Sequence, residues 1–153
     1  MIKVLFVCHG NICRSPMAEF LFKELVKQKG KEKEFNIESA ATSTEEIGNP
    51  VHYGTKKVLN NLGIDCGKKH ARQIRRSDYD DFDYIIGMDY YNIVNLKRFF
   101  SDDEHKIYRL LEFTQVDRDI EDPWYTHNFE STYRDISIGL EGFYSFLLEK
   151  NAI

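Results

Sequence analysis

The sequence predicts an α/β fold in which a parallel β-sheet lies between two layers of helices. Short apolar runs that are typical of buried strands alternate along the chain with longer amphipathic segments that are typical of helices. No internal repeat or Pro/Gly/Ser-rich linker interrupts this alternation. A length of 153 residues is enough for one hydrophobic core. We therefore expect residues 1–153 to form a single three-layer α/β/α domain around a four-stranded parallel sheet.

The four predicted strands are short and mostly apolar. The first, third and fourth are apolar runs with β-branched or aromatic residues, as expected for strands that are covered on both faces. The second alternates apolar and polar residues. These strands are expected at residues 3–7, 35–40, 84–88 and 107–111.

The predicted helices carry their apolar residues on one face. Ser15 is the expected N-cap of the first helix, with Pro16 at its first position. Gly63 is expected to end the second helix, and Asp89 to cap the fourth. The helices are expected at residues 16–29, 52–62, 77–81, 89–99 and 130–150, with an irregular stretch from 112 to 125.

Composition excludes several classes of protein. The net charge is −4, so the chain lacks the basic excess of a general nucleic-acid or anionic-membrane binder. No apolar run reaches the length of a membrane span, and the apolar N-terminal run is too short for a signal peptide. The three cysteines, Cys8, Cys13 and Cys66, are an odd number and lack metal-ligand spacing. We therefore expect a cytoplasmic protein with free thiols and with no metal, nucleic-acid or membrane partner.

The junction between the first predicted strand and helix carries the clearest chemical signal. Cys8 is followed six positions later by Arg14 and then by Ser15. The intervening residues can curl so that several backbone N–H groups face an anion, and the next helix adds its positive N-terminal end. Gly10 and Asn11 tolerate the positive φ that such a loop needs. The pattern therefore predicts a phosphate-binding loop between this strand and this helix.

Within this loop, Cys8 and Arg14 have the chemistry for phosphoryl transfer. The guanidinium of Arg14 can grip two phosphate oxygens, and the field that holds a phosphate dianion also favours a nucleophilic thiolate at Cys8. Plainer readings stay open: Cys8 as a packed, inert thiol, Ser15 as a helix cap only, and Cys13 as a loop residue. In the alternative interpretation, Cys13 traps oxidised Cys8 as a disulfide. Cys66 has no such neighbour in the sequence and is interpreted as a packed or surface thiol.

A carboxylic acid is also needed, because the departing oxygen requires a proton and the attacking water later requires a base. The best candidate is Asp122, which Pro123 biases to an extended backbone. Trp124 and Tyr125 follow as an apolar wall for an aryl substrate. The alternative reading is an ordinary Asp-Pro turn followed by packing aromatics.

Residues 7–19 resemble the signature loop and following helix of the low-molecular-weight protein tyrosine phosphatases, and residues 122–125 resemble the acid loop of that family. The resemblance covers nearly the whole chain and implies a four-stranded parallel sheet flanked by helices. It also implies a protein-tyrosine phosphatase that needs no cofactor. Its nucleophile would be Cys8, its phosphate binder Arg14, and its general acid and then base Asp122.

The same resemblance implies roles for the residues around these three. Asp89 would steady the arginines of the site, Arg72 among them, and Cys13 would be the redox partner of Cys8. The expected phosphate- and substrate-binding residues, of which Asn11 and Ser15 organise the loop, are His9, Gly10, Asn11, Ile12, Cys13, Ser15, Trp124 and Tyr125.

The chain departs from the family pattern at the mouth of the site and behind the loop. His9 replaces the usual aliphatic residue, and Glu45 occupies a position that often carries an aromatic wall. Lys69 stands where some members have a histidine that supports the loop, and the neighbouring His70 is the alternative support. The other histidines, His52, His105 and His127, are read as surface or capping residues.

Two other functions compete with phosphotyrosine hydrolysis. An arsenate reductase on the same fold would need a further cysteine pair in the middle of the chain, and no cysteine follows Cys66. A non-catalytic phosphate-binding module would need Arg14 but could dispense with Cys8 and Asp122. The expected partners are therefore tyrosine-phosphorylated proteins and small aryl phosphates, with inorganic phosphate as the product, and the expected state is a monomer.

Overall fold

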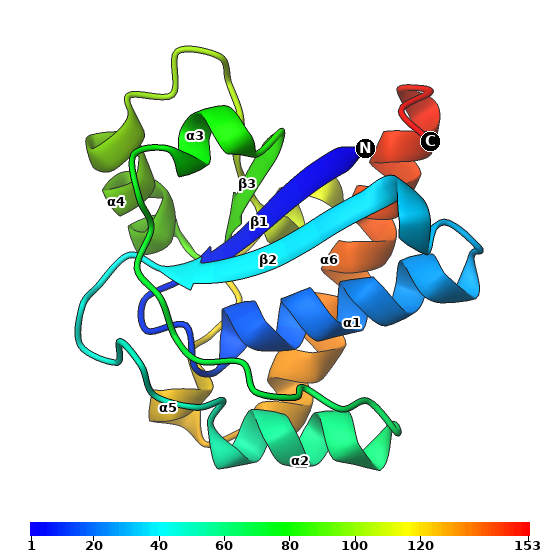
Figure 1. Ribbon diagram of the computed structural model, residues 1–153. Coiled ribbons are helices and arrows are strands. Elements are labelled where there is room, and N and C mark those ends of the chain that lie inside the picture. The colour runs from blue at the N-terminus through cyan, green and yellow to red at the C-terminus, as the bar shows by residue number, and fades with distance from the viewer.

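The computed structural model describes residues 1–153 as one sheet with helices on both faces (Figure 1). The sheet consists of β1 (Ile2–Cys8), β2 (Phe35–Ala41), β3 (Tyr84–Gly87) and β4 (Ile107–Arg109). Its spatial order is β2-β1-β3-β4, and every neighbouring pair is parallel. The predicted fold class is therefore confirmed.

The side chains of β1 point alternately into two hydrophobic cores, as the geometry of a strand requires. Val4 and Phe6 are fully buried in the larger core, on one face of the sheet. Leu5 and Val7 are fully buried in the smaller core, on the other face. Burial on both faces explains why this strand is an unbroken apolar run in the sequence.

Helices cover both cores and so form the outer layers (Figure 1). The larger core receives buried residues from α1 (Arg14–Gln28), α2 (Tyr53–Asn61) and α6 (Phe129–Glu149). The smaller core receives them from α3 (Asp78–Asp81) and α4 (Tyr90–Phe100). None of the helices combines the length and the apolar character that crossing a bilayer requires.

Side-chain caps set the start of two predicted helices. Asp89 Oδ1 accepts a hydrogen bond of 2.8 Å from the N–H of Asn92, and the Asn92 side chain accepts one of 3.2 Å from the N–H of Asp89, so the predicted cap of α4 is confirmed. His52 Nδ1 accepts a hydrogen bond of 3.0 Å from the N–H of Gly54. His52 is therefore the N-cap of α2, and the helix begins one residue after it, at Tyr53.

The predicted start of α1 was wrong. The helix begins at Arg14 and not at Pro16, and its N-cap is Cys13, which makes no side-chain capping bond. The hydroxyl of Ser15 faces buried polar partners instead of capping the helix. Pro16 is tolerated inside the first turn because the N–H groups there have no partner within the helix.

Three short elements also differ from the prediction. The fourth strand ends at Arg109, and the 3₁₀ turn η2 (Leu110–Phe113) replaces its expected end. The stretch expected to be irregular contains the short helix α5 (Pro123–Thr126). A further 3₁₀ turn, η1 (Glu32–Glu34), precedes β2 and was not predicted. These are short elements fixed by local bonds, such as the one of 2.7 Å from the N–H of Arg109 to Glu112 Oε1, and they have no periodicity to detect.

The order of the strands places a ligand site at the carboxyl end of β1. The chain passes from β1 to β2 on one side and then returns to β3 on the other side, so the winding direction reverses beside β1. In open parallel sheets, ligands bind where this reversal leaves a crevice beyond the strand ends. The loop of residues 9–13, which joins β1 to α1, lies at this crevice.

Candidate active site

The sulfur of Cys8 lies at the base of the loop between β1 and α1, and three donors approach it. Backbone N–H groups of Asn11 and Ser15 point to Sγ at 3.3 Å and 3.4 Å. The hydroxyl oxygen of Ser15 is 3.0 Å from Sγ. The Cys8 side chain is buried, so these three groups supply the polar contacts that water would otherwise make with its sulfur.

The first half of the loop turns its carbonyl groups outward. Cys8 O accepts from the N–H of Thr42, and His9 O accepts from the N–H of Ser43, both at 3.0 Å. In a trans peptide, the N–H of the next residue points away from the carbonyl. The N–H groups of His9 and Gly10 therefore face the inside of the loop.

The start of α2 holds the second half of the loop in the same way. The N–H of His52 donates to Ile12 O at 2.8 Å, and the buried hydroxyl of Thr55 donates to Cys13 O at 2.9 Å. The same peptide geometry turns the N–H groups of Cys13 and Arg14 inward. The loop is thus a ring of backbone donors, as predicted, and such a ring can bind an anion.

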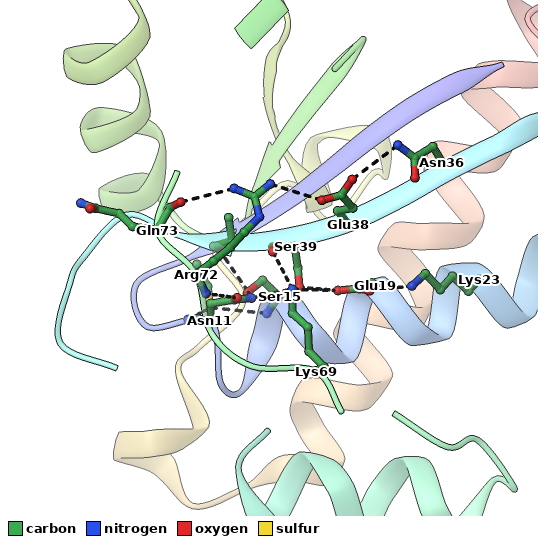
Figure 2. Close-up of polar contacts among 12 residues, drawn as sticks. Asn11, Ser15, Glu19, Lys23, Asn36, Glu38, Ser39, Lys69, Arg72 and Gln73 are labelled. Atoms are coloured by element: carbon green, nitrogen blue, oxygen red, sulfur yellow. Dashed lines mark hydrogen bonds and ion pairs between the residues drawn. The ribbon is translucent and has the colours of Figure 1, made fainter. Parts of the chain in front are cut away.

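Asn11 holds the loop from within. It has a φ of +59° and is almost completely buried. Its Nδ2 donates to Ser15 Oγ at 2.8 Å and to Ser39 Oγ at 2.9 Å, and its Oδ1 accepts from the N–H of Arg72 at 3.2 Å (Figure 2). These contacts tie α1, β2 and the segment before α3 to one side chain.

Behind Asn11 the polar network continues through Lys69 and through three residues that sequence reasoning missed, Ser39, Glu19 and Lys23. Ser39 donates to the buried carboxylate of Glu19, which also receives Lys23 Nζ at 2.6 Å (Figure 2). Lys69 Nζ donates to Ser39 O at 2.8 Å and lies 3.4 Å from Glu19, and burial lowers the pKa of Lys69. His70 is exposed and makes no such contact, so Lys69 is the residue that supports this network.

Arg14 is buried under the loop between two carboxylates. Its Nη1 donates to Asp89 Oδ2 at 2.7 Å and to Ile120 O at 2.8 Å, and its Nη2 lies 3.5 Å from Asp122 Oδ2. Burial alone lowers the pKa of Arg14, but the negative groups of Cys8, Asp89 and Asp122 outweigh this effect and raise it above its usual value. Arg14 Nε is the one buried side-chain donor or acceptor in the chain that has no hydrogen-bond partner.

The predicted pairing of Arg72 with Asp89 was wrong. The guanidinium of Arg72 binds Asp78 at 3.0 Å and 3.2 Å, and Glu38 at 3.5 Å. Asp78 is fully buried at the start of α3, so it is the stronger partner. Arg72 supports the site through its backbone N–H on Asn11, whereas Asp89 holds Arg14 alone.

The carboxylate of Asp122 is held at the mouth of the loop by α5. Its Oδ1 accepts from the N–H of Trp124 at 3.0 Å, which makes it the N-cap of this helix. Pro123 occupies the first helical position, where no N–H is needed. The other oxygen, Oδ2, remains directed toward Arg14.

These groups line one pocket of about 160 Å³. Trp124 and Tyr125 stand at its rim, with 51% and 78% of their surfaces exposed. His9 contacts Glu45 across the mouth. Glu46 also lines the pocket and was not predicted. The full lining is Cys8, His9, Gly10, Ile12, Cys13, Arg14, Glu45, Glu46, Asp122, Trp124 and Tyr125.

The three cysteines are free thiols in different surroundings. Cys13 lines the same pocket as Cys8 and is buried. Burial and the nearby Cys8 sulfur raise the pKa of Cys13 far above its usual value, so Cys13 stays a neutral thiol near pH 7. Of the two interpretations of Cys66, a packed or a surface thiol, the structure supports the first: Cys66 is buried in the larger core and does not line the pocket. No cluster of His, Cys, Asp and Glu side chains has the arrangement to hold a metal ion.

Comparison with known proteins places the chain in a described family. Residues 3–152 match the family described as low molecular weight phosphotyrosine protein phosphatase. The low molecular weight protein-tyrosine-phosphatase YfkJ of Bacillus subtilis (strain 168) is 46% identical over 145 residues, which are 92% of each chain. PtpA of Staphylococcus aureus, which carries the same family name, is 38% identical over 134 residues, which are 87% of this chain and 85% of PtpA.

Solved structures give the same result. The crystal structure of YfkJ superposes with a TM-score of 0.94 at 42% identity, over 98% of this chain and 96% of that one. The structure of SP-PTP, a low molecular weight protein tyrosine phosphatase from Streptococcus pyogenes, superposes with a TM-score of 0.83 at 45% identity, over 96% of this chain and 93% of that one.

Proposed function

The chain belongs to the low molecular weight protein-tyrosine phosphatase family of hydrolases, and from this premise we propose how it cleaves phosphotyrosine. The nucleophile is Cys8, the phosphate binder is Arg14, and the general acid and base is Asp122. The observation that carries the proposal is that Arg14, a residue that lines the pocket together with Cys8, has a buried Nε with no hydrogen-bond partner. A buried donor without a partner costs about 1–3 kcal/mol, and a phosphate oxygen would remove that cost.

In the first step, the Cys8 thiolate attacks phosphorus. A sulfur–phosphorus bond forms while the bond between phosphorus and the phenolic oxygen breaks. Asp122 gives its proton to that oxygen, and the phenol leaves neutral. The inward N–H groups of the loop and the guanidinium of Arg14 hold the phosphate oxygens as their charge develops.

In the second step, water replaces sulfur on phosphorus. Asp122, now ionised, takes a proton from the water as its oxygen bonds to phosphorus. The sulfur–phosphorus bond breaks, inorganic phosphate is released, and Cys8 returns to the thiolate. Ser15 assists because its hydroxyl is 3.0 Å from the departing sulfur. The positive field comes from Arg14 and the loop amides, so the proposed reaction uses no metal or cofactor.

The pocket favours flat aryl esters as substrates. Trp124 and Tyr125 offer aromatic faces at the rim, and Ile12 adds an apolar surface inside. We therefore assign tyrosine-phosphorylated proteins and small aryl phosphates as substrates of a monomeric enzyme. Its three free thiols suit a reducing compartment such as the cytoplasm. Cys13 is proposed to close a reversible disulfide with oxidised Cys8.

Turnover of p-nitrophenyl phosphate is the direct test. We expect release of p-nitrophenol and phosphate in equal amounts with EDTA present. A phosphate-binding module would show binding without turnover. An arsenate reductase would consume arsenate with a thiol donor, and Cys66 is buried away from the pocket that such a relay must reach. Either result in place of phosphate release would overturn the proposed function.

A further inference from the structure

His52 lies between two aromatic rings, one of which belongs to the pocket. Its imidazole stacks on Phe129 with the ring centroids 5.1 Å apart and the planes 17° from parallel. It also meets Trp124 at a centroid distance of 5.7 Å and an angle of 80°, an edge-to-face contact. From the sequence, His52 is expected to be a surface or capping residue; in the structure it caps α2 and also contacts the pocket wall.

The backbone and the side chain of His52 are both fixed. Its N–H donates to Ile12 O at 2.8 Å, and its Nδ1 accepts from the N–H of Gly54 at 3.0 Å. Because Nδ1 is the acceptor, a neutral imidazole carries its proton on Nε2. Rotation of the ring would therefore break the N-terminal cap of α2.

The residues on the Phe129 side of the imidazole are also closely packed. Gly54 lies so close to the ring of Phe129 that a Cβ atom at this position would be 2.4 Å from it. The start of α2 is thereby pressed against the start of α6, with His52 stacked on the same ring. The ring of Phe129 therefore covers one face of the imidazole, and close packing fixes where that ring lies.

Trp124 itself needs such a support. About half of its surface is exposed, and the helix that carries it, α5, has only four residues. An edge-to-face aromatic pair strengthens an association by about 2- to 10-fold beyond the effect of the area that it buries. The same residue holds Ile12 O in the phosphate loop, so His52 joins the wall to the site of the phosphate.

We propose that His52 is a positioning residue that holds Trp124 as the wall for the aryl group and so sets the preference for aryl phosphates over free phosphate. This inference rests on the proposed function and concerns its substrate selectivity. The chemistry at Cys8 and Arg14 does not depend on it.

The test compares binding of phenylphosphonate and inorganic phosphate by calorimetry. His52→Asn keeps a good capping acceptor but removes the ring, and His52→Phe keeps a ring but removes the acceptor. We expect His52→Asn to weaken phenylphosphonate by about 2- to 10-fold and to leave inorganic phosphate within about 2-fold. His52→Phe is expected to retain most of the preference for phenylphosphonate.

Fluorescence supplies a second readout because Trp124 is the only tryptophan in the chain. We expect its emission to change in His52→Asn and to remain closer to wild type in His52→Phe. Phe129→Leu removes the ring beneath the imidazole, keeps the cap, and is expected to lower the preference for phenylphosphonate in the same direction. It gives an answer even if His52→Asn does not fold.

The outcomes separate this inference from the proposed function. An unchanged binding ratio in His52→Asn, or in Phe129→Leu where His52→Asn does not fold, overturns the role of His52. Equal losses for both ligands overturn it too, because they indicate a damaged phosphate loop. Binding requires no turnover, so an inactive wild-type protein would count against the proposed function and leave this comparison intact.

Discussion

The side-chain amide of Asn11 donates a hydrogen bond of 2.8 Å to the hydroxyl oxygen of Ser15. The orientation of this amide is certain, because its Oδ1 accepts from the N–H of Arg72. Ser15 Oγ is thus an acceptor from Asn11, and its own proton has two acceptors within reach: Cys8 Sγ at 3.0 Å and Ala40 O at 3.5 Å. The shorter contact favours the sulfur. The side chain of Asn11 therefore acts on the sulfur through Ser15, in addition to the direct contact of 3.3 Å that the backbone N–H of Asn11 makes with Sγ.

Replacing Asn11 tests this relay. Asn11→Gly permits the φ of +59° but removes both donors and the acceptor, whereas Asn11→Ala adds backbone strain. We expect Asn11→Gly to lower the free energy of unfolding by about 1–3 kcal/mol and to slow turnover by about 10-fold or more. Urea unfolding and steady-state kinetics measure the two effects. Wild-type turnover in Asn11→Gly would contradict the proposed effect of Asn11, through Ser15, on the sulfur of Cys8.

Asp122→Ala tests the role of Asp122 as general acid when substrates with leaving groups of different pKa are compared. A phenol of high pKa needs the proton that Asp122 supplies, whereas an activated phenol leaves without much help. We expect Asp122→Ala to slow the cleavage of phosphotyrosine by about 10²–10⁴-fold and to slow the phosphorylation step with activated aryl phosphates far less. Single-turnover kinetics across a series of aryl phosphates measures this dependence. Equal losses along the series would contradict the assigned role.

The buried thiol of Cys13 makes stability depend on pH on the alkaline side. Burial raises its folded pKa far above the ordinary value of 9.0, so above about pH 9 the unfolded chain loses this proton and the folded chain keeps it. The unfolded state then binds fewer protons, and the free energy of unfolding falls as pH rises. One such group contributes a slope of about 1.4 kcal/mol per pH unit at full effect.

Cys13→Ala should make this slope shallower. The comparison with wild type belongs between about pH 9 and pH 10, in a reducing agent, with urea unfolding at each pH. Above that range three tyrosines, whose pKa values are also raised by desolvation, add slopes of the same sign: the buried Tyr79 and the partly buried Tyr84 and Tyr108. Identical slopes in the two proteins would show that Cys13 ionises normally when folded.

Peroxide tests the proposed pairing of the two pocket cysteines. The Cys8 thiolate reduces hydrogen peroxide and becomes a sulfenic acid, and the Cys13 thiol then displaces water to form a disulfide. We expect inactivation that dithiothreitol reverses, with a Cys8–Cys13 disulfide in the peptide map. In Cys13→Ser, the same treatment should give irreversible oxidation of Cys8. Reversible inactivation of wild type without this disulfide would remove Cys13 from the redox role.

Much of the fold follows from patterns that the sequence displays. The apolar run of β1 and the amphipathic pattern of α6 depend on burial along a whole element, and both were predicted. The start of α1 was misplaced because the hydroxyl of Ser15 contacts Cys8 Sγ and does not cap the helix. The capping preferences of single residues do not predict such a contact. The end of β4 was missed because a 3₁₀ turn depends on one or two bonds.

The residues of the candidate site also fall into two groups, those that the sequence identifies and those that only the folded chain brings together. Cys8, Arg14 and Ser15 lie within eight consecutive residues, and their spacing carries chemical information. Glu19 lies one helical turn after Ser15, so the pattern of α1 was a signal that could have placed it in the same network. Ser39 reaches that network from another strand, and only the folded chain brings it there.

The same holds for the arginines and for His52. Asp78 binds Arg72 because α3 places a buried carboxylate beside it, and no spacing rule distinguishes Asp78 from the neighbouring acidic residues. His52 meets Trp124 across a long separation in sequence. Contacts of this kind depend on tertiary packing and are invisible to periodicity.

The account depends most on the assignment of Cys8 as the residue that receives phosphate. Asp122→Ala with p-nitrophenyl phosphate should accumulate the intermediate, because the activated ester still phosphorylates the enzyme while hydrolysis lacks its base. Acid quenching followed by peptide mass spectrometry locates the phosphate. We predict a phosphate adduct on Cys8, and none in the same protein that also carries Cys8→Ser. An adduct on Cys13, or turnover that persists in Cys8→Ser, would contradict the account.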